Sequence, residues 1–301
     1  MISQTELNSL IKLHEEFLET NGEHGERLDL EGVSFKELDF QEGNLSKSSL
    51  KGCKFEKCCL KNVNFSEADI GSLLMEECEA QRCSFEKARL NNTFFVSNKM
   101  QGCSFFCSNI WKCIFRKNNL ERSVFSSISA TEEEKKTNLN FLFADYNNFD
   151  LSTFKNTIFY NTNNLRDCSF KNCNFDNCSF NGINFAGCDL TGISMQEAFF
   201  TECSFLKAKT EALDFGQCFL IDCLGNNKEI ITVQSHLFTC TIIKNQMYVG
   251  LLFNSQKKWF ETPDEEIVEQ LWIFNQEIPK EDLSKWWIIW KPILKKIADF
   301  S

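Results

Sequence analysis

The stretch that decides the fold runs from residue 45 to residue 70 and reads LSKSS LKGCK FEKCC LKNVN FSEAD I. Each group of five begins with an apolar residue, which we call the central position. Extending this grid in both directions gives twenty consecutive apolar central positions, from Leu30 to Phe125. Since 43% of the residues are hydrophobic, chance would produce such a run roughly once in ten million trials. The five-residue repeat is therefore real.

The repeat continues beyond a charged interruption at Ser129–Asn138, which we predict to be a protruding loop or a frayed coil. It resumes one residue out of phase at Leu139, and a one-residue insertion restores the first register from Leu165 to Leu220. In all, 37 pentapeptides carry 19 of the 31 phenylalanines at their central positions. A period of five fits neither an amphipathic helix nor a flat strand. The chain must turn a corner between inward residues, which predicts a solenoid of stacked coils.

With this pattern the chain resembles the pentapeptide-repeat proteins. The resemblance implies an all-β solenoid, a right-handed quadrilateral β-helix with one pentapeptide on each side and four in each coil. It covers about two thirds of the 301 residues and predicts a super-period of twenty residues. The rows that contain Phe55 and Phe65 are mostly phenylalanine, and the rows between them are mostly aliphatic. Large side chains should therefore stack on opposite walls, about 4.8 Å apart along the rod.

The 16 cysteines are predicted to fill core sites. Thirteen lie two residues before a central position, where the other occupants are mostly small and apolar, such as Ala68 and Ala88. Free cysteine behaves as a small buried hydrophobe. The five-residue spacing does not match that of zinc ligands, so metal or redox roles are the weaker alternative, and no cofactor is predicted. Free thiols in this number indicate a reducing compartment, and we expect a cytoplasmic protein.

Beyond the repeat, the sequence divides further, because a solenoid exposes its terminal coils and needs caps. At the N-terminus, Ser3 and Glu6 form a predicted capping box, and Asn21-Gly22 ends the helix. The four predicted segments are an N-terminal capping helix at 1–22, the pentapeptide-repeat β-helix at 23–225 with a loop near 129–138, irregular strands or a cap at 226–260, and a Trp-rich helical C-terminal segment at 261–301.

After Leu220 the pattern dissolves and other elements follow. A helix is predicted to start with Thr262 as its cap and Pro263 in its first turn. All three prolines lie in this last part, which agrees with continuous backbone pairing in the solenoid. Three short strands are predicted before the helix, at Glu229–Val233, Cys240–Lys244 and Met247–Phe253.

Five of the six tryptophans fall in the last 43 residues, and the helical spacing there places Trp286, Trp287 and Trp290 on one apolar face. They pack the C-terminal helices onto the last coil, or, with Trp272, they form a surface for self-association or for a partner protein. Nearby lysines give weaker support to contact with a membrane surface. Three acidic residues of the charged loop are a second candidate contact with a partner: Glu132, Glu133 and Glu134.

Composition and motifs argue against several functional classes. A net charge of −10 and a pI near 5.0 argue against direct binding of nucleic acid. The absence of 18 consecutive apolar residues argues against a membrane span, and the first ten residues do not resemble a signal peptide. The sequence contains no HExxH, P-loop, GxSxG or GxGxxG motif. We therefore predict that the chain is not an enzyme.

Two binding functions follow from the resemblance. The first is an interaction scaffold or specificity module of a bacterial defence, toxin-resistance or effector system, with secretion without a signal peptide as an alternative to the cytoplasm. Its partner is another protein or, through the C-terminal helices, a second copy of the chain. The second is a DNA-mimicking protector or inhibitor of DNA gyrase or topoisomerase IV. Charge weakens this alternative, because residues 21–125 carry 15 basic and 15 acidic side chains. Only residues 126–225 are acidic overall, with 7 basic and 13 acidic side chains.

Overall fold

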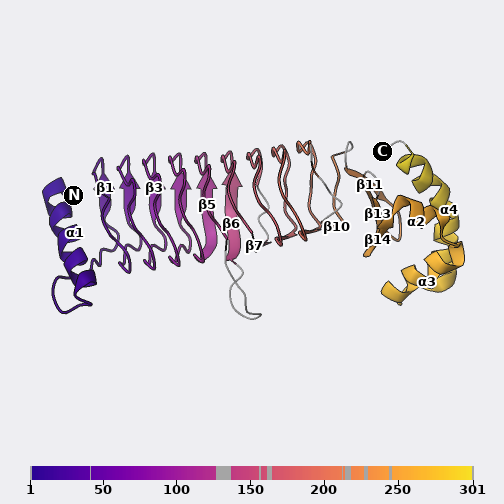
Figure 1. The fold of residues 1–301 in the computed structure, drawn as a ribbon, viewed down its shortest axis with the longest axis horizontal. Helices are drawn as coiled ribbons and strands as arrows, with labels where there is room; N and C mark the ends of the chain where they lie inside the picture. The colour runs from indigo at the N-terminus through magenta and orange to yellow at the C-terminus, as the bar shows by residue number, and fades with distance from the viewer. Residues whose placement is uncertain are drawn as a thin grey trace.

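The computed structural model describes residues 2–40, 42–126, 137–155, 157–160, 165–211, 213, 218–226, 230–243 and 246–299. The chain forms an elongated rod with a helix at its N-terminal end and further helices at its C-terminal end (Figure 1). Ten parallel strands run through the stacked coils, and a separate antiparallel sheet of four strands follows them. The predicted all-β solenoid with helical ends is confirmed.

Helix α1 (Gln4–Glu19) covers the first coil. The predicted capping box between Ser3 and Glu6 is present. The Gln4 side chain makes the hydrogen bonds that a preceding coil would make. It donates to the Asp39 carbonyl at 2.6 Å and accepts from the Asp39 N–H at 2.9 Å. The helix thereby satisfies backbone groups that a bare solenoid end would leave unpaired.

His14 joins α1 to the first coil through both ring nitrogens. Its Nδ1 accepts a hydrogen bond from the Leu28 N–H at 2.9 Å, so the ring proton must lie on Nε2. Nε2 donates to the Ser46 carbonyl, also at 2.9 Å. Burial lowers the pKa of His14, and the neutral ring is the form that this site accepts.

The solenoid strands stack in chain order, and each pairs in parallel with its neighbours. The register advances by twenty residues per coil, as the pairing of Phe35 with Phe55 and of Phe55 with Met75 shows. The predicted super-period is therefore confirmed. The strands are β1 (Ser34–Lys36), β2 (Lys54–Glu56), β3 (Leu74–Glu76), β4 (Phe94–Val96), β5 (Ile110–Arg116), β6 (Thr137–Asp145), β7 (Thr157–Tyr160), β8 (Ser179–Asn181), β9 (Phe199–Thr201) and β10 (Phe219–Ile221).

Two neighbouring sides of the solenoid carry these strands. The side with β1 to β4 is called the Phe55 wall here, and the side with β7 to β10 is called the Phe200 wall. Strand β5 runs around the corner between them, because it contains Ile110 of the Phe200 row and Phe115 of the Phe55 row. The hydrogen-bonded sheet thus changes wall in the middle of the rod.

Two insertions displace the repeat without breaking the stack. Between β5 and β6 the offset grows to 29 residues, since Phe115 pairs with Ala144. Between β7 and β8 it is 21, since Phe159 pairs with Phe180, which confirms the predicted one-residue insertion. Of the predicted charged loop, residues 129–136 lie outside the described residues. Its last two residues belong to β6, so the predicted loop extends too far.

The interior consists of stacked phenylalanine rings. Phe85, Phe105 and Phe125 lie nearly parallel in one row, with ring centroids 4.9 and 4.7 Å apart. Phe105 also meets Phe95 and Phe115 of the opposite row edge to face, at 6.2 and 5.9 Å. The predicted opposite walls of large side chains hold for this first half only. In the second half, phenylalanine stacks occur in all four rows: Phe149 on Phe170, Phe154 on Phe175, Phe180 on Phe200, and Phe185 on Phe205.

Almost every described side of a coil ends in a left-handed residue two positions after the central one. Lys47 and Glu67, for example, have φ of 58° and 60°. Such a conformation normally costs an L-residue about 1 kcal/mol, yet lysine, glutamate and asparagine adopt it throughout the rod. Because the turn recurs in every coil, these residues form ladders along the corners and expose charged side chains there.

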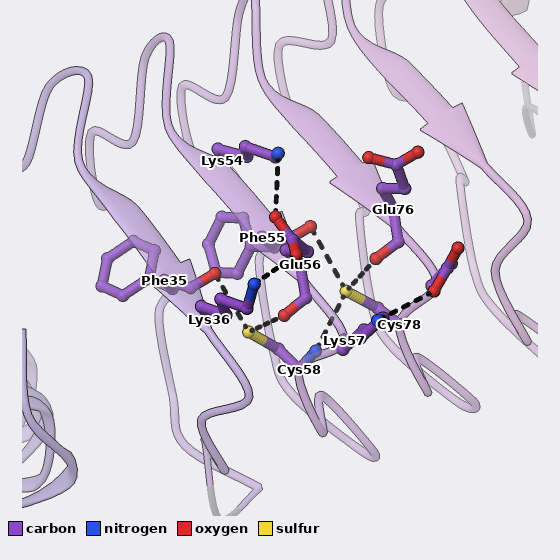
Figure 2. Close-up of polar contacts among 10 residues, drawn as sticks. Phe35, Lys36, Lys54, Phe55, Glu56, Lys57, Cys58, Glu76 and Cys78 are labelled. Carbon is purple, nitrogen blue, oxygen red and sulfur yellow. Dashed lines mark hydrogen bonds and ion pairs between the residues drawn. The ribbon is translucent and has the colours of Figure 1, made fainter. Parts of the chain in front are cut away.

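The thirteen cysteines two residues before a central position are buried as predicted, whereas Cys59 and Cys107 lie half-buried outside the core; all sixteen are free thiols. The site does more than fill space. Cys83 Sγ donates to the Leu60 carbonyl of the coil before it, at 2.9 Å, and Figure 2 shows the same arrangement for Cys58 and Cys78. Where the site holds Thr93 or an asparagine, their hydroxyl and amide groups make the same bond. The prediction of a merely small and apolar site is therefore incomplete, because many of its occupants are donors that link neighbouring coils.

The C-terminal sheet is antiparallel and follows the last coil. The predicted strand at Met247–Phe253 is wrong, because Gly250 (φ 55°) forms a turn that divides it into two strands. Tyr248 fastens the sheet to the solenoid by donating from Oη to the Cys218 carbonyl at 2.8 Å. The strands are β11 (Ile230–Gln234), β12 (Thr239–Ile243), β13 (Gln246–Val249) and β14 (Leu252–Ser255).

Three helices end the chain: α2 (Gln256–Glu261), α3 (Asp264–Phe274) and α4 (Lys280–Ala298). The prediction that Thr262 caps a helix with Pro263 in its first turn is wrong. Thr262 ends α2, and Pro263 occupies the N-cap of α3 without a side-chain hydrogen bond. The reason is local, since Pro263 itself has extended backbone (φ −56°, ψ 140°) and α3 therefore begins one residue later than predicted.

Candidate functional site

Three tryptophans form the core of the C-terminal cap. Trp259, Trp286 and Trp287 are at most 1% exposed, and each indole N–H has a partner. Trp259 donates to a carbonyl of β13 at 2.7 Å, Trp286 to Ser235 Oγ at 2.9 Å, and Trp287 to Asp264 Oδ1 at 2.9 Å. The prediction of Trp286 and Trp287 as partner contacts is therefore wrong, because both side chains are buried and both indole N–H groups already have an acceptor.

Trp272 and Trp290 lie at the edge of the same core and are half-buried. Lys280 Nζ lies 4.1 Å from the centroid of the Trp272 ring, and Trp290 stacks on Trp286 at 6.4 Å. As partner contacts, these two residues stay predictions. The predicted contacts Glu132, Glu133 and Glu134 lie outside the described residues.

The side of α4 that faces away from the tryptophan core is apolar and basic. Ile288, Ile289 and Ile293 are 65%, 57% and 42% exposed. Lys295 and Lys296 follow them, and neither makes an ion pair among the described residues, whereas Lys285 pairs with Glu281 and Lys291 with Asp264. We call this surface the α4 outer face: Ile288, Ile289, Ile293, Lys295 and Lys296.

A second exposed surface lies on the Phe200 wall at its C-terminal end. Phe199 and Phe219 point outward while their neighbours Phe200 and Leu220 fill the core. The two outward rings stack at 4.6 Å with an interplanar angle of 12°, and Phe253 of β14 meets Phe219 edge to face at 6.2 Å. Three exposed carboxylates accompany them, and we call the whole the acidic-aromatic face: Phe199, Phe219, Phe253, Glu197, Glu202 and Asp222.

The first half of the rod has a different surface, in which several carboxylates pair with lysines of the same or neighbouring coils. On the Phe55 wall, Glu56 lies between Lys36 and Lys54, each 2.9 Å away (Figure 2). Hydrogen bonds from both lysines lower the pKa of Glu56 to about 2. Glu79 is held in the same way by Lys61 and Lys99. With 15 basic and 15 acidic side chains in residues 21–125, this half carries no net charge.

Nothing in the described parts of the chain forms a recognisable catalytic centre. A groove of about 650 Å³ lies beside α1, and its lining combines Phe17 with cations such as Arg27 and Lys47 and with the acids Glu67 and Asp69. The lining residues offer no nucleophile with a neighbouring base. Across the described ranges, no group of three or more potential metal ligands converges. No helix among the described residues is long and apolar enough to cross a membrane.

Two family models, both described as pentapeptide repeats, match the sequence. A model of eight copies matches residues 29–67, and a model of nine copies matches residues 165–209. The two matches lie in the same solenoid, on either side of the charged insertion. The chain belongs to the pentapeptide-repeat proteins.

Solved structures with this fold are similar to the chain at low identity. QnrB1, a plasmid-mediated fluoroquinolone resistance protein, is 17% identical, with a TM-score of 0.42 over 67% of this chain and 93% of its own. HetL, involved in heterocyst differentiation regulation in the cyanobacterium Nostoc sp. strain PCC 7120, is 15% identical, with a TM-score of 0.32 over 69% and 92%. No curated protein matches the sequence significantly.

Sequence reasoning missed the outward phenylalanines of the acidic-aromatic face. Phe199 and Phe219 lie one position before the grid, at a separation of twenty residues. Such a repeated off-grid phenylalanine is the signal that could have found them, since neighbouring residues of a strand point to opposite sides.

Proposed function

We propose that the chain is a non-enzymatic protein-binding rod, an interaction scaffold or specificity module in a bacterial defence, toxin-resistance or effector context. The supporting observation is a set of large apolar side chains on the outside of the solenoid. Phe94 and Trp111 are 39% and 45% exposed in the middle of the rod, and Phe199 is 45% exposed near its end. The core does not need these rings, and exposed aromatic side chains are typical of protein interfaces.

The scaffold suits such a role, because each ring projects from a backbone that is hydrogen-bonded on both sides. A partner would order few additional groups on binding, which reduces the entropic cost of association. The sixteen free thiols also lead us to propose a reducing compartment such as the cytoplasm.

Photo-crosslinking in the cells that make the protein tests this function. A photoreactive phenylalanine analogue would replace Phe94, Trp111 or Phe199 in separate full-length variants, and the exposed Lys112 in a control variant. We expect discrete protein adducts at one or more of the aromatic positions and none at the control position. If none of the three positions yields a protein adduct, the proposed function is wrong.

The alternative is a DNA-mimicking protector or inhibitor of DNA gyrase or topoisomerase IV. It is favoured by the acidic balance of the second half of the rod, where Glu197, Glu202 and Asp222 make no ion pair with any described residue. The balance of basic and acidic side chains in the first half opposes it, because a mimic needs closely spaced charges of one sign. A supercoiling assay with purified gyrase, with and without a quinolone, tests this alternative. Inhibition or protection at micromolar protein would establish the mimic, and its absence removes it.

A further inference from the structure

We propose that the groove beside α1 binds a short, extended, acidic segment of a partner protein. The first observation is the set of cations that line this groove. Arg27, Lys47 and Lys87 belong to the lining, and none of the three makes an ion pair with any described residue. Cations gathered in a concave surface attract a ligand that carries negative charge.

The second observation is the order of the charges along the rod. Lys47, Glu67 and Lys87 are left-handed corner residues of three successive coils, with φ of 58°, 60° and 56°. Arg27 lies next to Lys47, because its Nε donates to the Lys47 carbonyl at 2.8 Å. Since coils stack about 4.8 Å apart, the charges follow one another over roughly 14 Å in the order positive, positive, negative, positive.

Phe17 of α1 supplies the apolar part of the lining. It is half-buried and does not belong to the core that α1 shares with the first coils. Its ring lies nearly parallel to that of His14, with centroids 6.2 Å apart, and His14 is itself bonded to the first coil through both ring nitrogens. The turn at Gly22 (φ 91°) passes so close that an added Cβ would lie 3.1 Å from the Phe17 ring. The ring is therefore held in place before any ligand arrives, which reduces the entropic cost of binding.

The acids of the lining determine which kind of anion fits. Asp69 is already shared by Lys51 and Arg89, with N–O distances of 3.2 and 3.9 Å. Glu67 makes no ion pair with any described residue, and it lies between two lysines of the ladder. A uniform polyanion such as a nucleic acid would place negative charge against Glu67, which disfavours it. A peptide can place an uncharged residue there and acidic residues on both sides.

The dimensions of the groove also fit a short peptide. An extended chain rises about 3.3 Å per residue, so the roughly 14 Å from Arg27 to Lys87 corresponds to about four or five residues. The groove volume of about 650 Å³ lies within the range of ligand-binding sites. The expected segment therefore has acidic residues at both ends, with an apolar residue for Phe17 and a polar residue for Glu67 between them.

This inference rests on the proposed function in one respect, namely that the partner is a protein. The aromatic positions chosen for cross-linking do not line the groove, and peptide binding is measured on the purified full-length chain. A chain that binds no acidic peptide would overturn the groove site and leave the protein-binding function standing. Absence of cellular adducts would overturn the function and leave the affinity of the groove for acidic peptides.

Fluorescence anisotropy with labelled, amidated hexapeptides tests the site at about 50 mM salt, where the Debye length exceeds 10 Å. The probe is Asp-Asp-Leu-Ser-Glu-Glu, and the matched peptide is Leu-Ser-Asp-Asp-Glu-Glu, which has the same composition with its four acids contiguous. We expect the wild type to bind the probe with a dissociation constant of about 1 mM or tighter, and the matched peptide at least about threefold more weakly. In the Glu67→Gln variant this preference should disappear, because the negative charge that creates it is gone.

Charge reversal locates the binding. Lys47→Glu/Lys87→Glu changes two left-handed corners of a ladder in which Glu67 already adopts this conformation, so the fold should tolerate it, and circular dichroism checks that it does. The matched control is Lys112→Glu/Lys117→Glu, two exposed left-handed corner residues outside the groove. We expect the groove variant to bind the probe at least about tenfold more weakly than the wild type, and the control to change the affinity less than about twofold.

Four results would each overturn the proposal. The wild type does not bind the probe, the two double variants lose affinity equally, or the preference between the peptides persists in Glu67→Gln. The fourth is tighter binding of the contiguous peptide or of a single-stranded oligonucleotide than of the probe, which would make the groove a general site for polyanions.

Discussion

A buried ladder of asparagine side chains tests most directly how the coils are held together. Asn98, Asn118 and Asn147 occupy the site two residues before the central position in three successive coils, and each is 2% exposed. Asn118 Oδ1 accepts from the N–H and the side-chain amide of Asn98, at 3.0 and 3.1 Å. Its Nδ2 donates to the Phe95 carbonyl at 2.8 Å and to Asn147 Oδ1 at 3.1 Å.

We expect Asn118→Ala to reduce the free energy of unfolding by about 3–5 kcal/mol. Each of the four hydrogen bonds contributes about 1 kcal/mol net. The Asn98 N–H would in addition be left without a partner in a dry interior, at a cost of about 1–3 kcal/mol. The contributions overlap and the surrounding groups relax in part, so the expected loss of unfolding free energy is about 3–5 kcal/mol and not their full sum.

Urea unfolding and native-state hydrogen exchange of the full-length chain measure the effect. The exchange of the Asn98 amide should accelerate most, because this is the amide that loses its acceptor. Asn119→Ala is the matched control, since this neighbouring side chain is half-buried and accepts one bond, from the Glu121 N–H at 3.2 Å. It should cost less than about 1 kcal/mol. Equal losses for the two variants, or an Asn98 amide that exchanges as in the wild type, would refute the reasoning.

Three further predictions concern protonation, thiols and backbone. The free energy of unfolding should decline as pH falls below about 6.5, by at most about 1.4 kcal/mol per pH unit, because the lowered pKa of His14 lets the unfolded chain bind a proton that the folded chain does not bind. The His14→Gln variant should lack this pH dependence. A thiol reagent should modify only Cys59 and Cys107 in the native protein, since they are half-buried and the other fourteen thiols are buried, and all sixteen after denaturation. Gly25→Ala should lower the unfolding free energy by about 2–3 kcal/mol, since its Cβ would lie 2.3 Å from a backbone oxygen of α1, whereas Gly32→Ala, at similar positive φ in open space, should cost about 1 kcal/mol.

The solenoid could be predicted from the sequence because its signal is redundant. A core that runs the length of the rod requires an apolar residue at every fifth position, and a single exception such as Thr210 does not hide the period. The same redundancy located both insertions to within a few residues. The helix at Gln4–Glu19 was predictable for a local reason, since its capping box lies within four residues of sequence.

The C-terminal cap was less predictable, because its pattern has no redundancy. Apolar residues at helical spacing identify one face of a helix, but they do not say whether a sheet of the same chain or another molecule covers that face. In α4 the covered side holds Trp286 and Trp287, and the side left to solvent holds Ile288 and Ile289. Tryptophan suits both roles, because it is enriched in interfaces and its large surface also makes it an effective filler of a small core.

The outward aromatic row could have been predicted from the rule that revealed the core. Central positions repeat every five residues because the chain turns a corner each time, whereas an outward contact repeats every twenty, because only the next coil brings the same wall back. Phe199 and Phe219 satisfy the second period and lie off the first. A solenoid sequence therefore contains two separable signals, one for stability at a period of five and one for outer surface at a period of twenty. The second signal directs the search for partners to a particular wall, here the Phe200 wall near the C-terminal cap.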